Sequence, residues 1–290
     1  MKNVISKVTL LIAALALAAL PAASRAQHFV ADTIIPERIA VKSTTYGITS
    51  INSLDTYLSG YSFSGGGVHI QHENFRDART GSYRWKYQTI FNGMLGYTTQ
   101  GNNSEIAGLA SYAWGGYHPF SIGKRLKLLA GAQIEVEGGA LYVPSNGNNP
   151  VSMKLRAAIA ASGMAIYHFP VKGKEWTARL QADVPLAGAM FAPEYGQSYY
   201  EIFGLGHAGG TVAFTHPFNS PSLRYMLTLD IPLKWRRHST TLRLSYTGNI
   251  FQSDINSIRC HIYRHSFGIG FARTIFKIKQ ENKIKAYSPF

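Results

Sequence analysis

Residues 223–251, LRYMLTLDIPLKWRRHSTTLRLSYTGNIF, alternate apolar and polar side chains with a period of two on both sides of a short basic turn, WRRHS. In the first half, leucine, tyrosine and isoleucine occupy one face, while Arg224, Thr228 and Asp230 occupy the other. The second half repeats this arrangement, with Arg243 among its polar residues. A period of two is that of a β-strand, whereas an amphipathic helix repeats every 3.6 residues. The stretch therefore predicts two antiparallel strands joined by a tight turn.

The same alternation recurs along most of the chain, between clusters of turn-forming residues. Each strand with its connection takes roughly 20 residues, longer than the 8 to 12 expected of a soluble β-sandwich. A strand that crosses a bilayer needs about 9 to 11 residues, an apolar face for lipid, a polar face for the lumen and aromatic residues at both interfaces. Alternation alone fits a soluble sandwich, but strand length and aromatic ends favour an all-β, transmembrane, antiparallel up-and-down barrel. The further segments are 85–99, 106–117, 125–137, 151–169, 176–186 and 257–276.

Residues 1–26 have the three parts of a secretory signal peptide: a basic start, the apolar core TLLIAALALAAL and an exit of small residues. We place cleavage after Ala26, with Ala23 as the alternative. The apolar core is shorter than the roughly 20 residues that a transmembrane helix needs, which argues against an uncleaved anchor. The predicted organisation is a signal peptide at 1–26 followed by a single outer-membrane β-barrel domain at 27–290.

The chain carries 29 lysine and arginine residues against 15 aspartate and glutamate residues, a formal net charge of +14. This charge is spread along the chain, and an exported protein meets anionic lipid head groups, lipopolysaccharide phosphates or acidic solutes rather than nucleic acid. We therefore expect outer-membrane lipids, the barrel-assembly machinery and a small solute as partners, and no nucleic acid or cofactor. The single cysteine, Cys260, excludes an intramolecular disulfide and a cysteine-based zinc site.

The C-terminal stretch HSFGIGFARTIF, residues 265–276, looks like the last strand of an outer-membrane barrel, with either Phe276 or Phe290 as the aromatic that such proteins present for assembly. The whole mature chain also resembles an uncharacterised family of exported Gram-negative barrels, domain of unknown function 3316. The stretches that carry the resemblance are 46–73, 182–204 and HSFGIGF. The resemblance implies a barrel in the outer membrane of a Gram-negative bacterium and brings no known activity.

The strand number follows from the rule that long connections lie outside the cell and short ones in the periplasm. Splitting residues 191–216 into strands near 197–204 and 208–216, and adding a first strand near 43–51, gives about twelve strands. The long stretches NSLDTYLSGYSF and ALYVPSNGNNPVS then both fall outside. The alternative is ten strands with the tyrosine-rich loop folded into the lumen.

The motif Leu-x-x-Asp-(Val/Ile)-Pro-Leu occurs twice, at 180–186 and at 227–233. Alternation assigns its aspartates, Asp183 and Asp230, to the lumen face. Proline lacks the N–H that a membrane strand must pair, so both prolines are expected at strand ends or bulges. The two copies are expected to run in opposite senses in a barrel of twelve strands and in the same sense in one of ten.

The lumen face is expected to hold charges of both signs. Opposite charges that face each other across a narrow barrel form a salt-linked filling, whereas the same residues around a wider bore form a selectivity ring. A lumen of twelve strands lies between these cases, so size does not decide between them. The lumen-lining candidates are Lys86, Arg179, Asp183, Arg224, Asp230 and Arg243, with Glu135 as a further acidic residue.

The stretch APEYGQSYYEIFG, residues 192–204, combines tyrosines with acidic residues. Such a loop is able to stack on a sugar or to hold a cationic solute at a pore mouth. The alternative, an aromatic belt at the membrane interface, is the interpretation we favour. The extracellular-loop binding candidates are Glu194, Tyr195, Tyr199, Tyr200 and Glu201.

Catalytic residues are not assigned, because none of the ten histidines is followed two residues later by a serine. That spacing puts both side chains on one strand face, where an imidazole activates a hydroxyl. His261 and His265 share a strand face, and His69 and His72 lie beside Glu73, but neither group has a clear third ligand, so no metal is assigned. Three hypotheses stay open: a small-solute channel or transport protein, a lipid-acting enzyme, and a structural or surface-binding barrel. An enzyme is not favoured.

Overall fold

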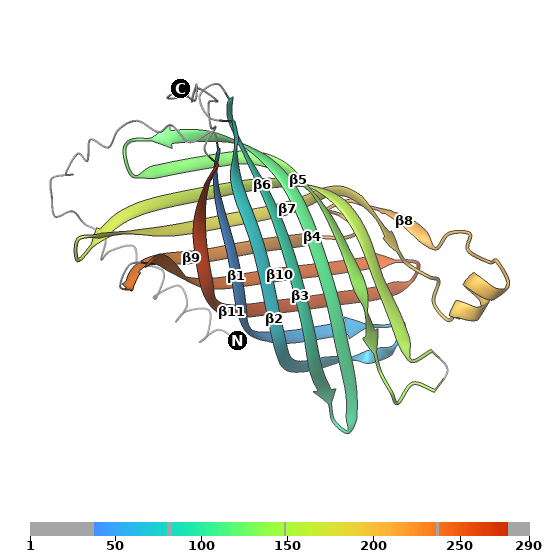
Figure 1. The fold of residues 1–290 in the computed structure, drawn as a ribbon. Coiled ribbons are helices and arrows are strands. Elements are labelled where there is room, and N and C mark those ends of the chain that lie inside the picture. Colours follow the sequence, from blue (N-terminus) through green and yellow to red (C-terminus); the bar gives the residue numbers. More distant parts are fainter. Residues whose placement is uncertain (1–37, 80–82, 148, 236–237, 278–290) are drawn as a thin grey trace, which may run out of the picture. The chain divides into compact units, whose positions relative to one another are not determined.

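The computed structural model describes residues 38–79, 83–147, 149–235 and 238–277. In these residues one antiparallel sheet closes on itself, with ten strands around the ring (Figure 1). Each ring strand pairs with its neighbour in sequence, and β1 pairs with β11. The ring consists of β1 (Arg38–Asp55), β2 (Ser59–Arg79), β3 (Tyr83–Gln100), β4 (Asn103–Ile122), β5 (Leu126–Tyr142), β6 (Val151–Val171), β7 (Lys174–Phe191), β9 (Ser222–Trp235), β10 (His238–Ile255) and β11 (Ile258–Lys277).

The predicted all-β antiparallel barrel is confirmed, but the predicted count of twelve strands is wrong and the alternative of ten is right. The predicted strand near 197–204 instead contains a short π-helix, Tyr200–Gly204. The predicted strand at 208–216 is reduced to β8 (Val212–Thr215), which pairs with the end of β7 and does not cross the barrel. Gly206 and Gly210, with φ of 77° and 80°, turn the chain between these two elements and prevent an extended strand.

The connections fall at two ends of the barrel. We name the end with the long connection 192–221 the loop end; it also carries the connections 56–58, 101–102, 143–150 and 256–257. The opposite end, named the turn end, carries the short connections 123–125 and 172–173 (Figure 1). The predicted long segment NSLDTYLSGYSF is mostly strand, because β1 and β2 extend to within three residues of each other. The predicted signal peptide and Phe290 lie outside the described residues.

The two Asp-x-Pro motifs pair with each other. β7 and β9 are antiparallel neighbours, and Leu180 of one copy is paired with Leu227 of the other. The expectation that the copies run in the same sense in a ten-stranded barrel is therefore wrong, because β8 does not cross between them. The ladder between β7 and β9 runs from Thr177↔Asp230 to Asp183↔Arg224, so each motif's proline lies two residues beyond its end.

Both prolines thus occupy positions where a missing N–H does little harm. Pro185 also sits at a bulge, where the register with β6 shifts and Leu186 is left unpaired. Pro232 lies beyond the last β7 partner of β9 and is paired only with Thr241 of β10. The expectation that the prolines mark strand ends or bulges is confirmed.

The barrel is apolar outside and polar inside. Large apolar side chains on the outer face are exposed, such as Ile48 at 70%, Val68 at 62% and Leu95 at 58%. Inward-facing polar side chains are buried, such as Glu73 at 2% and Gln181 at 1%. A soluble β-sandwich has the reverse polarity, because its interior is the apolar core. The outer wall is therefore built to face lipid.

Candidate functional site

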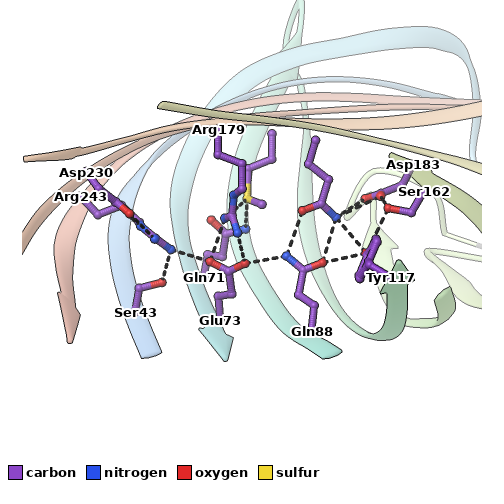
Figure 2. A network of polar contacts seen from close by, with 12 residues as sticks. Ser43, Gln71, Glu73, Gln88, Tyr117, Ser162, Arg179, Asp183, Asp230 and Arg243 are labelled. Atoms are coloured by element: carbon purple, nitrogen blue, oxygen red, sulfur yellow. Dashed lines mark hydrogen bonds and ion pairs between the residues drawn. The ribbon is translucent and has the colours of Figure 1, made fainter. Parts of the chain in front are cut away.

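A polar septum crosses the middle of the lumen, and Glu73 of β2 lies at its centre (Figure 2). Arg179 of β7 donates to both carboxylate oxygens of Glu73, at 2.6 and 2.8 Å. Arg243 of β10 donates to Glu73 at 2.5 Å and, through Nε and a second N–H, to both oxygens of Asp230 at 2.6 Å. The two N–H groups of a guanidinium match the two oxygens of a carboxylate. These contacts therefore require a defined orientation of both side chains as well as opposite charges.

Two glutamine side chains continue the septum from Glu73 toward the opposite wall. Gln88 of β3 donates to Glu73 at 2.5 Å. Gln88 and Gln181 of β7 then donate to each other's amide oxygens, at 2.9 and 3.0 Å. Tyr117 of β4 donates to the Gln88 oxygen at 2.8 Å and is itself fully buried. Polar groups buried in this way need such partners, because each unmet group costs about 1–3 kcal/mol.

The far side of the septum is a second ionic group around Arg224 of β9. Its Nε donates to Asp183 at 2.8 Å, and a terminal N–H donates to Glu135 of β5 at 3.0 Å. Ser162 of β6 links Asp183 to Tyr117 (Figure 2). Ser43 of β1 accepts from Arg243 at 2.7 Å, so in the described part of the chain the septum takes side chains from every barrel strand except β11.

The six predicted lumen-lining residues all face the interior. Arg179, Asp183, Arg224 and Arg243 are at most 5% exposed and belong to the septum with Asp230. Lys86 does not belong to the septum. It pairs with Asp77 and lines a cavity between the septum and the turn end. Of the two arrangements considered from sequence, the structure has the salt-linked filling rather than a ring around an open bore.

A cavity of about 320 Å³ lies on the turn-end side of the septum and opens toward the turn end. Arg179, Asp230 and Arg243 form its floor, so the septum and the cavity share these residues. Its walls combine apolar residues with threonines. Lys86, Lys127 and His168 add basic groups, and Glu175, which lies 3.7 Å from His168, adds an acidic one. The Nε of Arg179 has no hydrogen-bond partner among the described residues. The apolar wall residues include Val41, Phe75, Leu129 and Ile166.

The loop-end half of the lumen is filled by an apolar cluster instead. Leu141 is fully buried at its centre, and Tyr57 of the β1–β2 connection closes it from above. Burial raises the pKa of Tyr57 to about 12. The cluster comprises Ile51, Tyr57, Leu58, Phe63, Met94, Ala107, Leu109, Leu141, Val143, Met190, Ala192, Phe251, Ile258, Cys260 and Ile262.

The connection 192–221 is tied over this cluster. The hydroxyl of Tyr57 donates to the backbone oxygen of Gln197 at 2.8 Å. Tyr199 accepts from the backbone N–H of Met153 at 2.7 Å and packs against the cluster. Asn256 donates to the backbone oxygens of Ala192 and Gly210, at 2.6 and 3.0 Å. The lumen is therefore closed at its loop end as well as in its middle.

The five predicted loop residues do not form one site. Tyr195 and Tyr200 are exposed at 67% and 71%, whereas Tyr199 is partly buried at the barrel mouth. Glu201 accepts from the backbone N–H and the hydroxyl of Ser198, which hold the pKa of Glu201 below its usual value. Glu194 is exposed at the other side of the loop. The sequence alternative with ten strands places this tyrosine-rich loop inside the lumen. Of the five residues, only Tyr199 reaches the mouth of the lumen, where it packs against the apolar cluster.

Three more ion pairs lie between the septum and the loop end. Lys154 pairs with Asp55 at 2.5 Å. Arg264 of β11 pairs with Glu137 at 2.6 Å, and Arg156 lies 3.9 Å from the same carboxylate. Lys154, Arg156, Glu137 and Arg264 stand on inward faces of strands that the sequence predicts, whereas Asp55 lies in a stretch predicted as an outside connection. Sequence alternation is able to find such residues, whereas only the closed ring shows which of them meet.

The histidine pairs noted in the sequence do not converge on metal sites. His69 faces the lumen and His72 faces the outer surface. The two are three residues apart on β2, and residues an odd number of positions apart on a strand point to opposite faces. His261 and His265 do share the outer face, where His261 contacts Asn52 and stacks on Tyr263. Among the described residues, no three histidine, cysteine or acidic side chains are grouped to hold a metal ion.

The closed ring with an apolar exterior and a buried polar interior defines a transmembrane β-barrel of the outer-membrane type. In the described residues, helices that are long and apolar enough to cross a membrane are absent. The family model described as "Protein of unknown function (DUF3316)" matches residues 8–282, and the chain belongs to this family. The resemblance predicted from the sequence is confirmed.

Several solved structures are similar to this chain at low identity. The outer membrane protease OmpT from Escherichia coli has 8% identity and a TM-score of 0.47, with 85% of this chain and 99% of that chain covered. The β domain of the Bordetella autotransporter BrkA has 13% identity and a TM-score of 0.38, covering 81% and 98%. An outer membrane channel from Pseudomonas putida F1 has 9% identity and a TM-score of 0.36, covering 87% and 100%. No curated protein sequence matches the chain.

Proposed function

We propose that the protein is a closed barrel of the Gram-negative outer membrane that binds a small organic anion in its turn-end cavity. The observation that carries this proposal is the cavity of about 320 Å³, whose floor is made by septum arginines. A concave site with apolar walls and a few convergent polar groups is the usual form of a small-molecule site. The cavity opens toward the periplasm if the loop end faces outside, which is the orientation that short periplasmic turns favour.

The chemistry of the cavity favours an anion with an apolar body. Arg179 and Arg243 line the floor, and Lys127 stands exposed on the cavity wall. Phe75 and Leu129 offer an apolar surface to the rest of the solute. An anionic group that reaches the floor also competes with Glu73 and Asp230 for the septum arginines. Outer-membrane lipids are the expected partners of the outer wall, because its exposed side chains are apolar.

The closed lumen does not fit the hypothesis of a permanently open channel. Solutes would have to pass both the septum and the apolar cluster beneath the connection 192–221. The residues once expected to set the field along a bore instead satisfy one another's charges across it. A surface-binding or solute-binding barrel is the hypothesis that the geometry supports best.

The test uses full-length protein in lipid nanodiscs and two fluorinated probes of equal size, 4-fluorobenzoate and 4-fluorobenzylamine. Line broadening in ¹⁹F spectra is expected for the carboxylate and not for the amine. Lys127→Glu should weaken carboxylate binding about tenfold, which corresponds to about 1.4 kcal/mol. The matched control is Lys124→Glu, which makes the same charge change at the same end, in the β4–β5 connection outside the cavity. Equal broadening by both probes, or equal effects of both variants, would contradict the proposal.

A further inference from the structure

The outer wall carries a serine and a histidine directly opposite one another. Ser50 of β1 and His265 of β11 are register partners, and both are exposed on the outer face. Side chains opposite each other in an antiparallel pair have Cβ atoms about 4.5–5.5 Å apart, which makes Ser50 and His265 immediate neighbours on the outer wall. The spacing rule applied to the sequence, serine two residues after histidine, does not find pairs of this kind, because the partners come from opposite ends of the chain.

Two tyrosines hold the imidazole of His265 by one nitrogen. The hydroxyl of Tyr246 lies 3.0 Å from Nδ1, and the two rings stack with their centroids 6.2 Å apart. The hydroxyl of Tyr225 lies 3.4 Å from the same atom. Tyr225 reaches it by lying across Gly248, where an added Cβ would be 2.2 Å from the tyrosine ring. In the tautomer in which Nδ1 carries the hydrogen and donates to these oxygens, Nε2 is the basic nitrogen of His265.

The pair lies at the boundary between the apolar and polar parts of the outer wall. One register step toward the turn end, the outward row is apolar: Phe267, Ile48 and Val68 are paired in sequence across three strands and are 53%, 70% and 62% exposed. Toward the loop end, Asn52 follows Ser50 on the same face and contacts His261. At this depth a barrel wall meets the interfacial part of a lipid, where ester linkages lie.

A groove of about 390 Å³ lies between the pair and the loop-end rim, and its nearest lining residue is Tyr263, the next residue before His265 on the same face of β11. His261 and Tyr263, which precede His265 on the same face of β11, form part of its wall. Arg259 gives it a cation suited to a phosphate, and Phe218, 94% exposed, gives it an apolar edge. The groove is therefore complementary to a lipid head group and to the first part of its acyl chains.

We propose that Ser50 and His265 form a hydrolytic site for the carboxylic esters of membrane lipids, with the rim groove as the site of the head group. This site is separate from the turn-end cavity and does not rest on solute binding there. The source of the ester, a phospholipid or the acyl chains of lipopolysaccharide, is a question for the experiment.

The reaction follows from the two side chains and water. Ser50 Oγ attacks the ester carbonyl carbon while its proton passes to His265 Nε2. The bond from that carbon to the alcohol oxygen breaks, and the alcohol leaves with the proton from His265. Water then attacks the acyl-Ser50 ester, again losing a proton to His265, and releases a fatty acid and free Ser50. Tyr246 is a positioning residue, since it holds His265 and does not meet the substrate.

A second hydroxyl–imidazole pair on the same wall serves as an internal comparison. Thr44 Oγ1 lies 2.9 Å from His72 Nδ1, nearer the turn end of β1 and β2. Neither residue of this pair has a same-face strand neighbour in the rim groove, whereas His265 has Tyr263. Thr44→Ala therefore removes a hydroxyl beside an imidazole on the same wall without touching the proposed site.

The experiment exposes the folded full-length protein to a fluorophosphonate probe and maps the modified residue by mass spectrometry. It then measures fatty acid release from phospholipid vesicles with and without lipopolysaccharide. Labelling of Ser50 is expected, with release lost by at least about 100-fold in Ser50→Ala and in His265→Asn, and unchanged in Thr44→Ala. Tyr246→Phe should lower kcat, leave KM unchanged and move the limb of the pH–rate profile that reports His265.

The shift in gel mobility on heating shows that each variant is folded. Release from phospholipid vesicles alone identifies phospholipid as a substrate, and release only when lipopolysaccharide is present identifies its acyl esters. Labelling at Thr44 instead of Ser50, release that persists in Ser50→Ala, or the absence of release by the wild-type protein from both vesicle types would overturn the proposal.

Discussion

The middle of the lumen and its loop end are both filled, but by different chemistry. In the middle, Arg179 and Arg243 share the carboxylate of Glu73, and each contact has a fixed direction. At the loop end, side chains such as Leu141 and Ile262 pack without directed contacts. Apolar filling depends mainly on volume and tolerates exchange, whereas each buried guanidinium needs its own acceptor. The middle should therefore depend on the identity of a few residues, and the loop end on the total volume of many.

The largest effect is expected from Glu73→Leu. This variant leaves Arg179 and part of Arg243 buried without an acceptor, so the free energy of unfolding should fall by about 3–5 kcal/mol. Urea unfolding of the protein in lipid vesicles measures the change. Adding Arg179→Met to Glu73→Leu should recover part of the loss, because the unpaired charge is then removed. Additive losses would contradict the view that these two residues act as a pair.

Leu141→Ala tests the apolar half of the comparison. Leu141 is fully buried, and removing its side chain should lower the free energy of unfolding by about 2–4 kcal/mol through lost burial and a residual cavity. Leu141→Met, which nearly conserves volume, should cost under about 1.5 kcal/mol in the same urea measurement. A Leu141→Met variant as unstable as Leu141→Ala would show that shape, and not volume, governs the loop end.

Asn256→Ala tests how the connection 192–221 is held over the loop end. The change removes the donor that the backbone oxygens of Ala192 and Gly210 share, so cleavage of this connection by chymotrypsin should be faster, by about fivefold for a local loss of about 1 kcal/mol. Asn102→Ala, an exposed position in the β3–β4 connection, is the control. Equal cleavage rates for the two variants would mean that Asn256 does not anchor the connection.

The smallest effect is expected from Lys86→Met. Lys86 pairs with Asp77 at the partly exposed wall of the turn-end cavity, so the free energy of unfolding should change by less than about 1 kcal/mol. Urea unfolding of this variant beside Glu73→Leu compares an exposed ion pair with a buried one. A loss as large as that of Glu73→Leu would contradict the division of the lumen into a buried septum and an open cavity.

Much of the fold was predictable because alternation is a local signal. The strands at 223–251 and the inward faces of Asp183 and Asp230 follow from a period of two, and no knowledge of their neighbours is needed. The strand count failed at 191–216, where the sequence also alternates. There, left-handed glycines such as Gly206 and the short pairing of β8 with β7 decide the path, and neither follows from hydrophobic periodicity.

The candidate sites were less predictable, because they depend on which strands meet. Alternation identifies Arg179 and Arg243 as lumen residues, but Glu73 stands out in the sequence only as a neighbour of His72, and Gln88 belongs to no motif. The contact between Arg243 and Glu73 joins residues 170 positions apart in the sequence. The pairing of Ser50 with His265 spans nearly the whole barrel domain and exists only because β1 closes the ring against β11.

The central claim is that the lumen is closed, and conductance across a planar lipid bilayer tests it most directly. The folded full-length protein should give no steady ion current above the bilayer's own leak at ±100 mV, because the septum and the apolar cluster both block the path. Stable, ohmic current steps from the wild-type protein would contradict this account.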